Sequence, residues 1–166
     1  MPAAARGRAP ARSRGRPARG GPLQTLLTCP PPSHAAAVAI ADILLVDDET
    51  FLHEIYTDFL QLHGHKVVGI AYNGEEAVSV FRSLPRKPQV VIMDQRMPVK
   101  SGVDATREIL AMAKNTRVIF SSADVHARRA SVEAGAAGFV QKPFTLEELL
   151  RAVEAALGGP EGARKA

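Results

Sequence analysis

The chain has 166 residues, and its net charge of +4 is unevenly distributed. Residues 1–41 hold six of the 21 Lys and Arg residues and none of the 17 Asp and Glu residues, so the remaining 125 residues carry a charge of −2. The basic balance therefore describes a tail, which argues against a nucleic-acid-binding domain inferred from net charge. A single Cys excludes an internal disulfide framework and a cysteine-rich zinc site. The longest unbroken apolar run has seven residues, whereas a membrane-spanning helix needs about 20.

Residues 1–34 consist mostly of Ala, Arg, Pro and Gly. Such a segment has too few large apolar side chains to offset the entropy of ordering it, so we predict a disordered tail over residues 1–41. An Arg-rich, acid-free start is also typical of a transit peptide, a nucleic-acid arm or a membrane-surface arm. The alternative is that the tail has no function because it is translated from sequence upstream of the true start, which would then lie near Val38. Deleting residues 1–38 and measuring salt-dependent DNA binding would separate a binding arm from an inert tail.

The pattern becomes regular at Ile43. Residues 43–46 form a short apolar run that predicts a buried strand followed by an acidic loop. Apolar residues then recur at helical spacing, and Gly64 closes that helix. This stripe comprises Leu52, Ile55, Phe59 and Leu62. Residues 67–71 predict a second strand, and Asn73 caps the helix that follows.

The second half of the chain repeats the alternation of strand and helix. The predicted strands are residues 90–93, 117–121 and 139–140. Three helices are predicted. The first carries the apolar stripe Ala105, Ile109, Leu110 and Met112, the second spans residues 125–134 and ends at Gly135, and the third spans residues 146–157. Five strand–helix repeats predict an open, doubly wound α/β fold with a parallel sheet covered on both faces.

In such folds, ligands bind beyond the carboxyl ends of the strands. The polar residues expected at that rim are Asp47, Asp48, Glu49, Asp94, Ser121, Ser122 and Lys142. Singly, each is explained by a helix cap or a solvated strand end, but together they predict one site. Carboxylates about 4 Å apart repel by about 4 kcal/mol at an effective dielectric near 20, so they require a cation. Oxygen ligands without His or Cys favour Mg²⁺, and Lys142 provides a second positive charge for a phosphoryl group.

Residues 42–157 resemble the receiver domain of a two-component response regulator. The resemblance rests on four motifs: residues 43–49 (ILLVDDE), residues 90–94 (VVIMD) with Met97, Pro98 and Gly102, Ser122-Ala123, and Gly135-Ala136 leading to Lys142-Pro143-Phe144. It implies a flavodoxin-like, five-stranded parallel sheet of order 2-1-3-4-5 with helices on both faces, over residues 42–158. Residues 159–166 are then a short polar end. The interval from Ser122 to Lys142 is slightly shorter than the family commonly has, which predicts a trimmed fourth helix.

The resemblance also implies a role for individual residues. Asp94 is expected to accept the phosphoryl group. Mg²⁺ is expected to bind Asp48 and Asp94 directly, Asp47 through water, and the backbone carbonyl of Arg96. Lys142 is expected to pair with the phosphoryl group and to precede Pro143 through a cis peptide bond. Ser122 and Phe139 are the expected switch pair, with Ser121 open as the alternative hydroxyl.

The resemblance implies a cytoplasmic signalling protein, not an enzyme acting on an outside metabolite. It would catalyse only its own Mg²⁺-dependent phosphorylation and dephosphorylation. The expected partners are a sensor histidine kinase and a downstream protein target, and the expected assembly is a monomer or weak dimer. A relay to a histidine phosphotransfer protein is one alternative, and regulation of nucleic-acid or membrane binding through the Arg-rich tail is another. Only nine residues follow Leu157, so we expect a stand-alone receiver. Haloacid-type hydrolases need a second Asp two residues after the nucleophile. Arg96 occupies that position here, which argues against such an enzyme.

Overall fold

A computed structural model describes residues 40–158 of the chain. The predicted disordered tail, apart from its last two residues, and the predicted polar end at 159–166 lie outside the described residues. Ala41, placed in the tail by the sequence, is 1% exposed, and its carbonyl accepts a hydrogen bond from the Lys66 amide at 2.8 Å. The folded part therefore begins at least one residue earlier than predicted.

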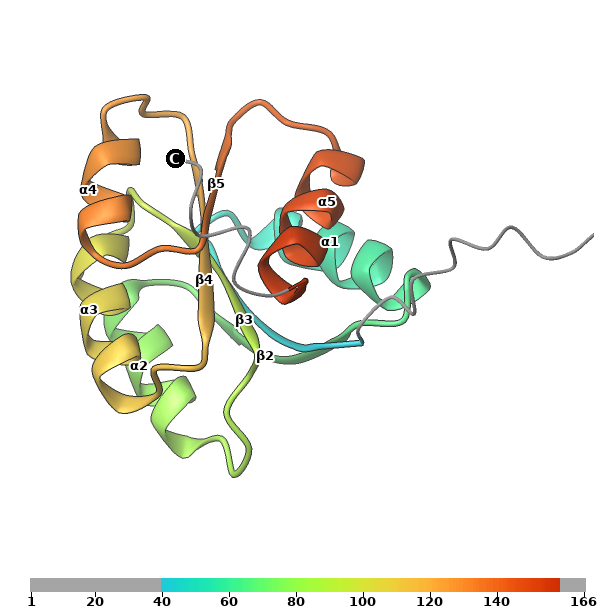
Figure 1. The fold of residues 1–166 in the computed structure, drawn as a ribbon, viewed down its shortest axis with the longest axis horizontal. Helices are drawn as coiled ribbons and strands as arrows, with labels where there is room; N and C mark the ends of the chain where they lie inside the picture. Colours follow the sequence, from blue (N-terminus) through green and yellow to red (C-terminus); the bar gives the residue numbers. More distant parts are fainter. Residues whose placement is uncertain (1–39, 159–166) are drawn as a thin grey trace, which may run out of the picture. The chain divides into compact units, whose positions relative to one another are not determined.

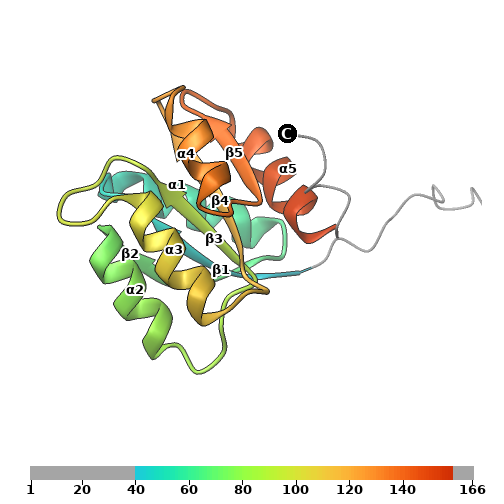
Figure 2. The ribbon, with the colours of Figure 1, turned by 60° about the vertical axis from the view of Figure 1, so that its left-hand side comes forward.

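Five parallel strands form one sheet in the order β2-β1-β3-β4-β5, as the family resemblance implied (Figures 1 and 2). They are β1 (Asp42–Val46), β2 (Lys66–Ala71), β3 (Val90–Asp94), β4 (Arg117–Ser122) and β5 (Gly138–Gln141). Every predicted strand is present, with ends that move by one residue. The central strands β1 and β3 are buried on both faces, because helices cover each face.

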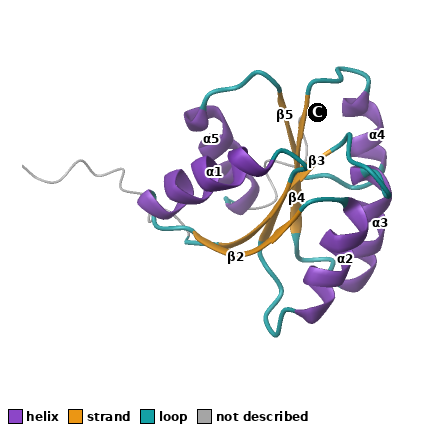
Figure 3. Cartoon of the chain, turned by 180° about the vertical axis from the view of Figure 1, so that it is seen from behind, coloured by secondary structure: helices purple, strands orange, loops and turns teal. Residues whose placement is uncertain are grey.

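Five helices alternate with the strands. They are α1 (Thr50–Leu62), α2 (Gly74–Ser83), α3 (Gly102–Met112), α4 (Ala127–Glu133) and α5 (Leu146–Leu157). Helices α1 and α5 cover one face of the sheet, and α2, α3 and α4 cover the other (Figures 1 and 3). With seven residues, α4 is the shortest of the five described helices, in keeping with the predicted trimming.

The helix ends follow the local sequence. Asn73 caps α2 as predicted, because its side chain accepts the amide of Glu76. A reciprocal capping box joins Thr145 and Glu148 at the start of α5. After α1, the chain reverses at Gly64, whose φ of +87° suits a residue without a side chain.

The predicted apolar stripe of α1 is wrong for two of its four residues, whereas Leu52 packs against the core and Phe59 is half-buried. The helix buries His53, Tyr56 and Leu60, whereas Leu62 is 82% exposed and Ile55 is 44% exposed. Both sets have helical spacing, but the inner face includes an imidazole and a phenol beside the aliphatic Leu60. The sequence pattern could not decide between two stripes offset by one residue.

Candidate functional site

Three charged side chains from three strand ends meet at the carboxyl-terminal rim of the sheet. Asp47 follows β1, Asp94 ends β3, and Lys142 follows β5. The ammonium of Lys142 lies 2.8 Å from Asp47 Oδ2 and 3.2 Å from Asp94 Oδ1. The side chains of Asp47 and Asp94 are only 4% and 8% exposed. The sequence predicted this convergence, because parallel strands end at a common edge.

Backbone amides hold the two carboxylates in place. Asp47 Oδ1 accepts the amide of Glu49 at 3.0 Å, and Asp94 Oδ2 accepts the amide of Arg96 at 2.8 Å. Gly102 packs directly against the Asp94 carbonyl, and a Cβ atom at this position would overlap that oxygen. Both carboxylates are therefore fixed by the strand–loop junctions that carry them.

Burial dominates the electrostatics of Asp94. It raises the pKa of that carboxyl, and the charge of Asp47 raises it further, while Lys142 and the Arg96 amide oppose the shift without cancelling it. Burial alone would lower the pKa of Lys142, but its hydrogen bond to Asp47 and the charges of both aspartates outweigh burial and raise that pKa well above its ordinary value. The site thus combines a lysine whose ammonium form is favoured with a buried carboxyl group whose ionised form is disfavoured.

The predicted magnesium ligands are only partly assembled. Asp48 is exposed at the rim, and within residues 40–158 no three His, Cys, Asp or Glu side chains are arranged to hold a metal ion. Lys142 Nζ stands between Asp47 and Asp94, and Glu49 lies 3.7 Å from the same ammonium. The four rim carboxylates exceed the single ammonium in charge, and all their donor atoms are oxygen. This chemistry fits a hard divalent cation such as Mg²⁺.

Ser122 and Phe139 lie on the face of the sheet that α2, α3 and α4 cover. Phe120 pairs with Phe139 across β4 and β5, and Ser122 follows two residues after Phe120, so strand alternation puts all three on one face. The Ser122 hydroxyl accepts the Asp124 amide at 3.1 Å. The Ser121 hydroxyl is buried and has no hydrogen-bond partner within residues 40–158. The Lys142–Pro143 bond is cis, as expected from the resemblance.

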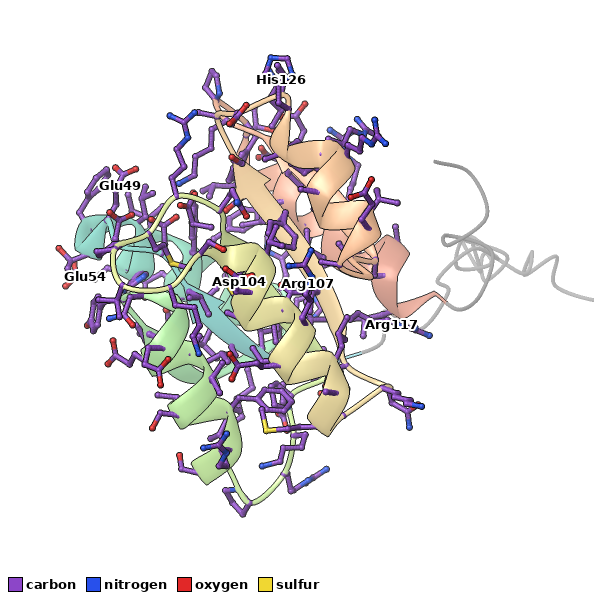
Figure 4. The ribbon with its side chains drawn as sticks, turned by 90° about the vertical axis from the view of Figure 1, so that its left-hand side faces the viewer. Glu49, Glu54, Asp104, Arg107, Arg117 and His126 are labelled. Carbon is purple, nitrogen blue, oxygen red and sulfur yellow. The ribbon has the colours of Figure 1, made fainter. Side chains whose placement is uncertain are left out.

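A pair of side chains bridges the loops after β3 and β4. Arg96 Nη2 lies 3.0 Å from Asp124 Oδ2, with the two side chains 77% and 25% exposed. The hydrogen bond from Arg96 is the main reason why the pKa of Asp124 falls below its ordinary value. Figure 4 shows where this loop lies relative to β4. Arg117 begins the strand, and His126, two residues after Asp124, lies beyond its other end.

Sequence reasoning missed Tyr56 as part of the surroundings of the site. Its ring stacks on Phe144 at 6.0 Å, and both residues line a hollow of about 340 Å³ that also includes Lys142. Burial raises the pKa of Tyr56 to about 12, with further contributions from the nearby carboxylates. The available signal was its spacing from His53 and Leu60 on the inner face of α1.

Comparison with known proteins identifies the family. Residues 43–154 match the response regulator receiver domain. The chain belongs to this family. It is 35% identical over 113 residues to the chemotaxis protein CheY of Thermotoga maritima, which covers 67% of this chain and 92% of that relative. This receiver domain is therefore a component of two-component signal transduction.

Solved receiver structures share its fold. The CheX–CheY–BeF₃–Mg²⁺ complex of Borrelia burgdorferi matches with a TM-score of 0.66 at 28% identity, covering 70% of this chain and 88% of that chain. The response regulator domain of Thermotoga maritima CheB matches with a TM-score of 0.65 at 29% identity, covering 74% and 99%. The flavodoxin-like sheet order is thus the order of the family. Within residues 40–158, none of the helices has the length and apolar character needed to cross a membrane.

Proposed function

We propose that this receiver domain is phosphorylated on Asp94 by a sensor histidine kinase. The observation that supports it most is the buried Asp94 carboxylate at the end of β3, whose Oδ1 lies 3.2 Å from the ammonium that it shares with Asp47. An Asp94 oxygen attacks the phosphorus of the donor, and the bond from phosphorus to the leaving imidazole nitrogen breaks. The product is an aspartyl phosphate. The electron pair of the broken P–N bond stays on the histidine imidazole of the kinase.

In this proposal, Mg²⁺ would be held directly by the carboxylates of Asp48 and Asp94 and by the backbone carbonyl of Arg96, and through water by Asp47. When bound, it neutralises the developing charge on the phosphoryl oxygens. The excess of carboxylates over ammonium at the rim supports such a cation. The related CheY in the Borrelia complex carries Mg²⁺ and BeF₃.

Lys142 remains an ammonium throughout, because its pKa is raised. We expect it to pair with the incoming phosphoryl oxygens once phosphorylation removes the negative charge from the Asp94 carboxylate. The Asp47 contact at 2.8 Å keeps the ammonium at the rim during that change. Lys142 thus orients and stabilises the product without transferring a proton.

The switch requires more than one hydrogen bond. Moving a population from 1:99 to 99:1 takes about 5.5 kcal/mol of differential interaction, whereas one hydroxyl bonded to a charged oxygen contributes roughly 1.5–3 kcal/mol. We therefore propose that Ser122, Lys142 and repacking of Phe139 act together. The shared sheet face of Ser122 and Phe139 supports their coupling.

The output in this proposal is a changed protein-binding surface read by a downstream target. The Borrelia relative is bound to CheX, which gives one instance of a receiver that engages another protein. A relay to a histidine phosphotransfer protein uses the same Asp94 chemistry in reverse. In both cases the domain acts on its partners and not on an outside metabolite. The monomeric or weakly dimeric state belongs to the same proposal, as does the extent of the domain, predicted as residues 42–158 and widened at its start by Ala41.

Phosphorylation can be tested with acetyl phosphate and intact-mass measurement on the full chain. We expect one phosphoryl group per chain in the presence of Mg²⁺ and none after chelation. Asp94→Asn should abolish labelling, whereas Asp104→Asn, which changes an exposed aspartate on α3, should label normally (Figure 4). Full labelling of Asp94→Asn would overturn the assignment.

Adjacent serines provide a matched pair for the switch. We expect Ser122→Ala to be phosphorylated but to gain only part of the affinity for a target, because one phosphoryl contact is lost. Ser121→Ala should behave as wild type, since its hydroxyl makes no hydrogen bond within the described residues. The reverse result would assign the switch to Ser121.

A further inference from the structure

The loop between β3 and α3, residues 95–101, contains a strained turn. Val99 has a φ of +69°, and the Lys100 amide donates across it to the Pro98 carbonyl at 2.8 Å. A hydrogen bond that spans one residue of positive φ forms the rarer, strained type of γ-turn, and a β-branched residue seldom adopts this conformation. The Val99 side chain is 85% exposed, so burial of its methyl groups does not offset the strain.

Contacts with α2 and α3 hold this turn from outside the loop. The amide of Gly74, the first residue of α2, donates to the Lys100 carbonyl at 3.2 Å. The Lys100 ammonium lies 2.6 Å from Glu75 on α2 and 2.6 Å from Glu108 on α3. Helices α2 and α3 lie side by side on one face of the sheet (Figure 2), so one residue of the loop joins both helices. These three contacts are called the Lys100 clamp below.

The clamp is built closely around the backbone. A Cβ atom on Gly74 would lie 2.5 Å from the Lys100 carbonyl oxygen, so only glycine permits this approach. The first amides of a helix have no partner within the helix, and the Lys100 carbonyl provides one for α2. Strained backbone persists where the surrounding contacts over-determine it, and the clamp supplies such contacts directly after Val99.

The other side of the turn carries a group of the proposed magnesium site. The Arg96 amide donates to Asp94 Oδ2 at 2.8 Å, but within residues 40–158 no backbone amide donates to the Arg96 carbonyl. The direction of that carbonyl is therefore set by the backbone between Arg96 and the clamp. This stretch is only four residues long, and Pro98 within it has a fixed φ. Relaxation of the turn at Val99 would therefore change the direction of the Arg96 carbonyl.

We propose that Lys100 is a positioning residue for the metal site, which holds the strained turn at Val99 and thereby directs the Arg96 carbonyl toward Mg²⁺. This inference rests on the proposed function, because it requires Mg²⁺ at the rim. Lys100 does not contact the ion, and it acts through the backbone of the loop. A purely electrostatic role has the opposite sign, because an ammonium repels Mg²⁺ and its loss alone would strengthen Mg²⁺ binding.

The test is a Mg²⁺ titration of the unphosphorylated, ¹⁵N-labelled full chain, followed by NMR at the amides of Asp94 and Arg96. Lys100→Met removes the ammonium and keeps the aliphatic stem, and it should weaken Mg²⁺ binding about threefold, because exposed ion pairs are individually weak. Lys114→Met, which removes an exposed ammonium just after α3, is the matched control and should bind as wild type does. Unchanged or tighter binding by Lys100→Met would overturn the positioning role. A wild-type chain that does not bind Mg²⁺ would instead overturn the proposed metal site, and this inference with it.

Relief of the strain gives a readout that ion pairing alone would not change. Asn adopts a positive φ more readily than Val does, so Val99→Asn removes the strain that the clamp opposes. In a Val99→Asn background, Lys100→Met should weaken Mg²⁺ binding by less than about 1.5-fold, because the turn no longer depends on the clamp. An equal loss in both backgrounds would show that Lys100 does not act through the turn.

Gly74 tests the clamp from the side of α2 without changing any charge. Gly74→Ala places a Cβ atom against the Lys100 carbonyl, so it should shift the Arg96 and Lys100 amide resonances before metal is added and should weaken Mg²⁺ binding at least as much as Lys100→Met does. Gly138→Ala is the control, because its Cβ atom would meet only Ile119, at an ordinary distance of 3.6 Å, and it should bind Mg²⁺ as wild type does. Wild-type Mg²⁺ affinity in a folded Gly74→Ala chain with a shifted Lys100 amide would contradict the proposal.

Discussion

Lys142 and Lys100 each lie within 3.2 Å of two carboxylates, and the two groups differ mainly in how deeply those carboxylates are buried. The lysine side chains are equally accessible, at 19% and 20% exposed. Lys142 contacts Asp47 and Asp94, which are 4% and 8% exposed, whereas Lys100 lies 2.6 Å from both Glu75 and Glu108, which are 61% and 46% exposed. The shorter contacts therefore belong to the more solvated group.

The acids respond in opposite directions. The hydrogen bond from Lys100 lowers the pKa of Glu75, as an ion pair normally does. The pKa of Asp94 is raised despite its lysine, because burial and the charge of Asp47 prevail. The exposed carboxylates near Lys100 remain hydrated, so their ion pairs add little stability. The buried carboxylate of Asp94 has lost its water, so a bound cation or conversion to a phosphate ester would remove an unfavourable charge. Burial and not contact distance marks the reactive group.

The largest expected effect comes from Lys142→Met. This change leaves Asp47 and Asp94 buried without their ammonium, and we expect the free energy of unfolding at pH 7 to fall by about 3 kcal/mol. Burial already raises the pKa of Asp94 and Lys142 opposes that shift, so without the lysine stability is lost as pH rises above the ordinary pKa of this carboxyl and is recovered as pH falls. Urea unfolding at several pH values measures this. A loss of stability that does not depend on pH, or an equal loss in Lys100→Met, would show that burial of the carboxylates does not distinguish the two groups.

Asp94→Asn should act in the opposite direction. A carboxyl whose folded pKa is raised is destabilising once ionised, so the neutral amide should increase the free energy of unfolding at pH 7 by about 1 kcal/mol. Below the ordinary value of 3.8, wild-type Asp94 is protonated in both states, and the gain should disappear. Asp104→Asn, at an exposed site, should show no such pH-dependent gain. A destabilised Asp94→Asn protein at pH 7 would show that the Lys142 contact outweighs burial.

Much of this arrangement was predictable from sequence. The strand–helix alternation located all ten elements, and acids at the ends of the apolar runs indicated the site, because parallel strands end at one edge. The strand order came from the family resemblance, since alternation alone does not fix it.

Other features depend on tertiary packing and were not predictable. Nothing in the pattern showed that Asp47 would be buried while its neighbour Asp48 would be exposed, or that α1 would turn His53 and Tyr56 inward. The inner face of α1 depends on its rotation against the sheet, which a periodic pattern leaves open when two stripes share its spacing. Asp47 meets Lys142, which follows β5 and is distant in sequence, so this contact needs the tertiary fold.

The Arg96–Asp124 pair gives a smaller, kinetic effect. The pair joins the loops after β3 and β4 by a contact of 3.0 Å. In the proposed aspartyl phosphate, water must attack the phosphorus in line with its bond to the Asp94 oxygen. We expect the bridge between the two loops to obstruct that approach. We expect Arg96→Ala with Asp124→Ala to shorten the half-life of the phosphorylated form about two- to fivefold, with stability unchanged, because exposed pairs contribute little.

The half-life is measured as phosphate loss after removing the donor. The control is Arg107→Ala with Asp104→Ala, which breaks an exposed pair on α3, away from the rim (Figure 4). The control should dephosphorylate at the wild-type rate. Equal half-lives for all three proteins would show that the Arg96–Asp124 bridge does not obstruct water.

The smallest effect is expected from Lys100→Met, which tests the exposed half of the comparison. The substitution removes both 2.6 Å contacts but keeps the aliphatic stem and the hydrogen bond from the Gly74 amide to the residue 100 carbonyl. Glu75 and Glu108 then return to water instead of remaining buried and unpaired, so the melting temperature should fall by at most about 2 °C. Molar salt screens surface charges and should abolish even this difference from wild type, whereas the loss in Lys142→Met should persist in salt. A salt-resistant loss in Lys100→Met comparable with that of Lys142→Met would mean that contact distance, and not burial of the carboxylates, sets the strength of the two groups.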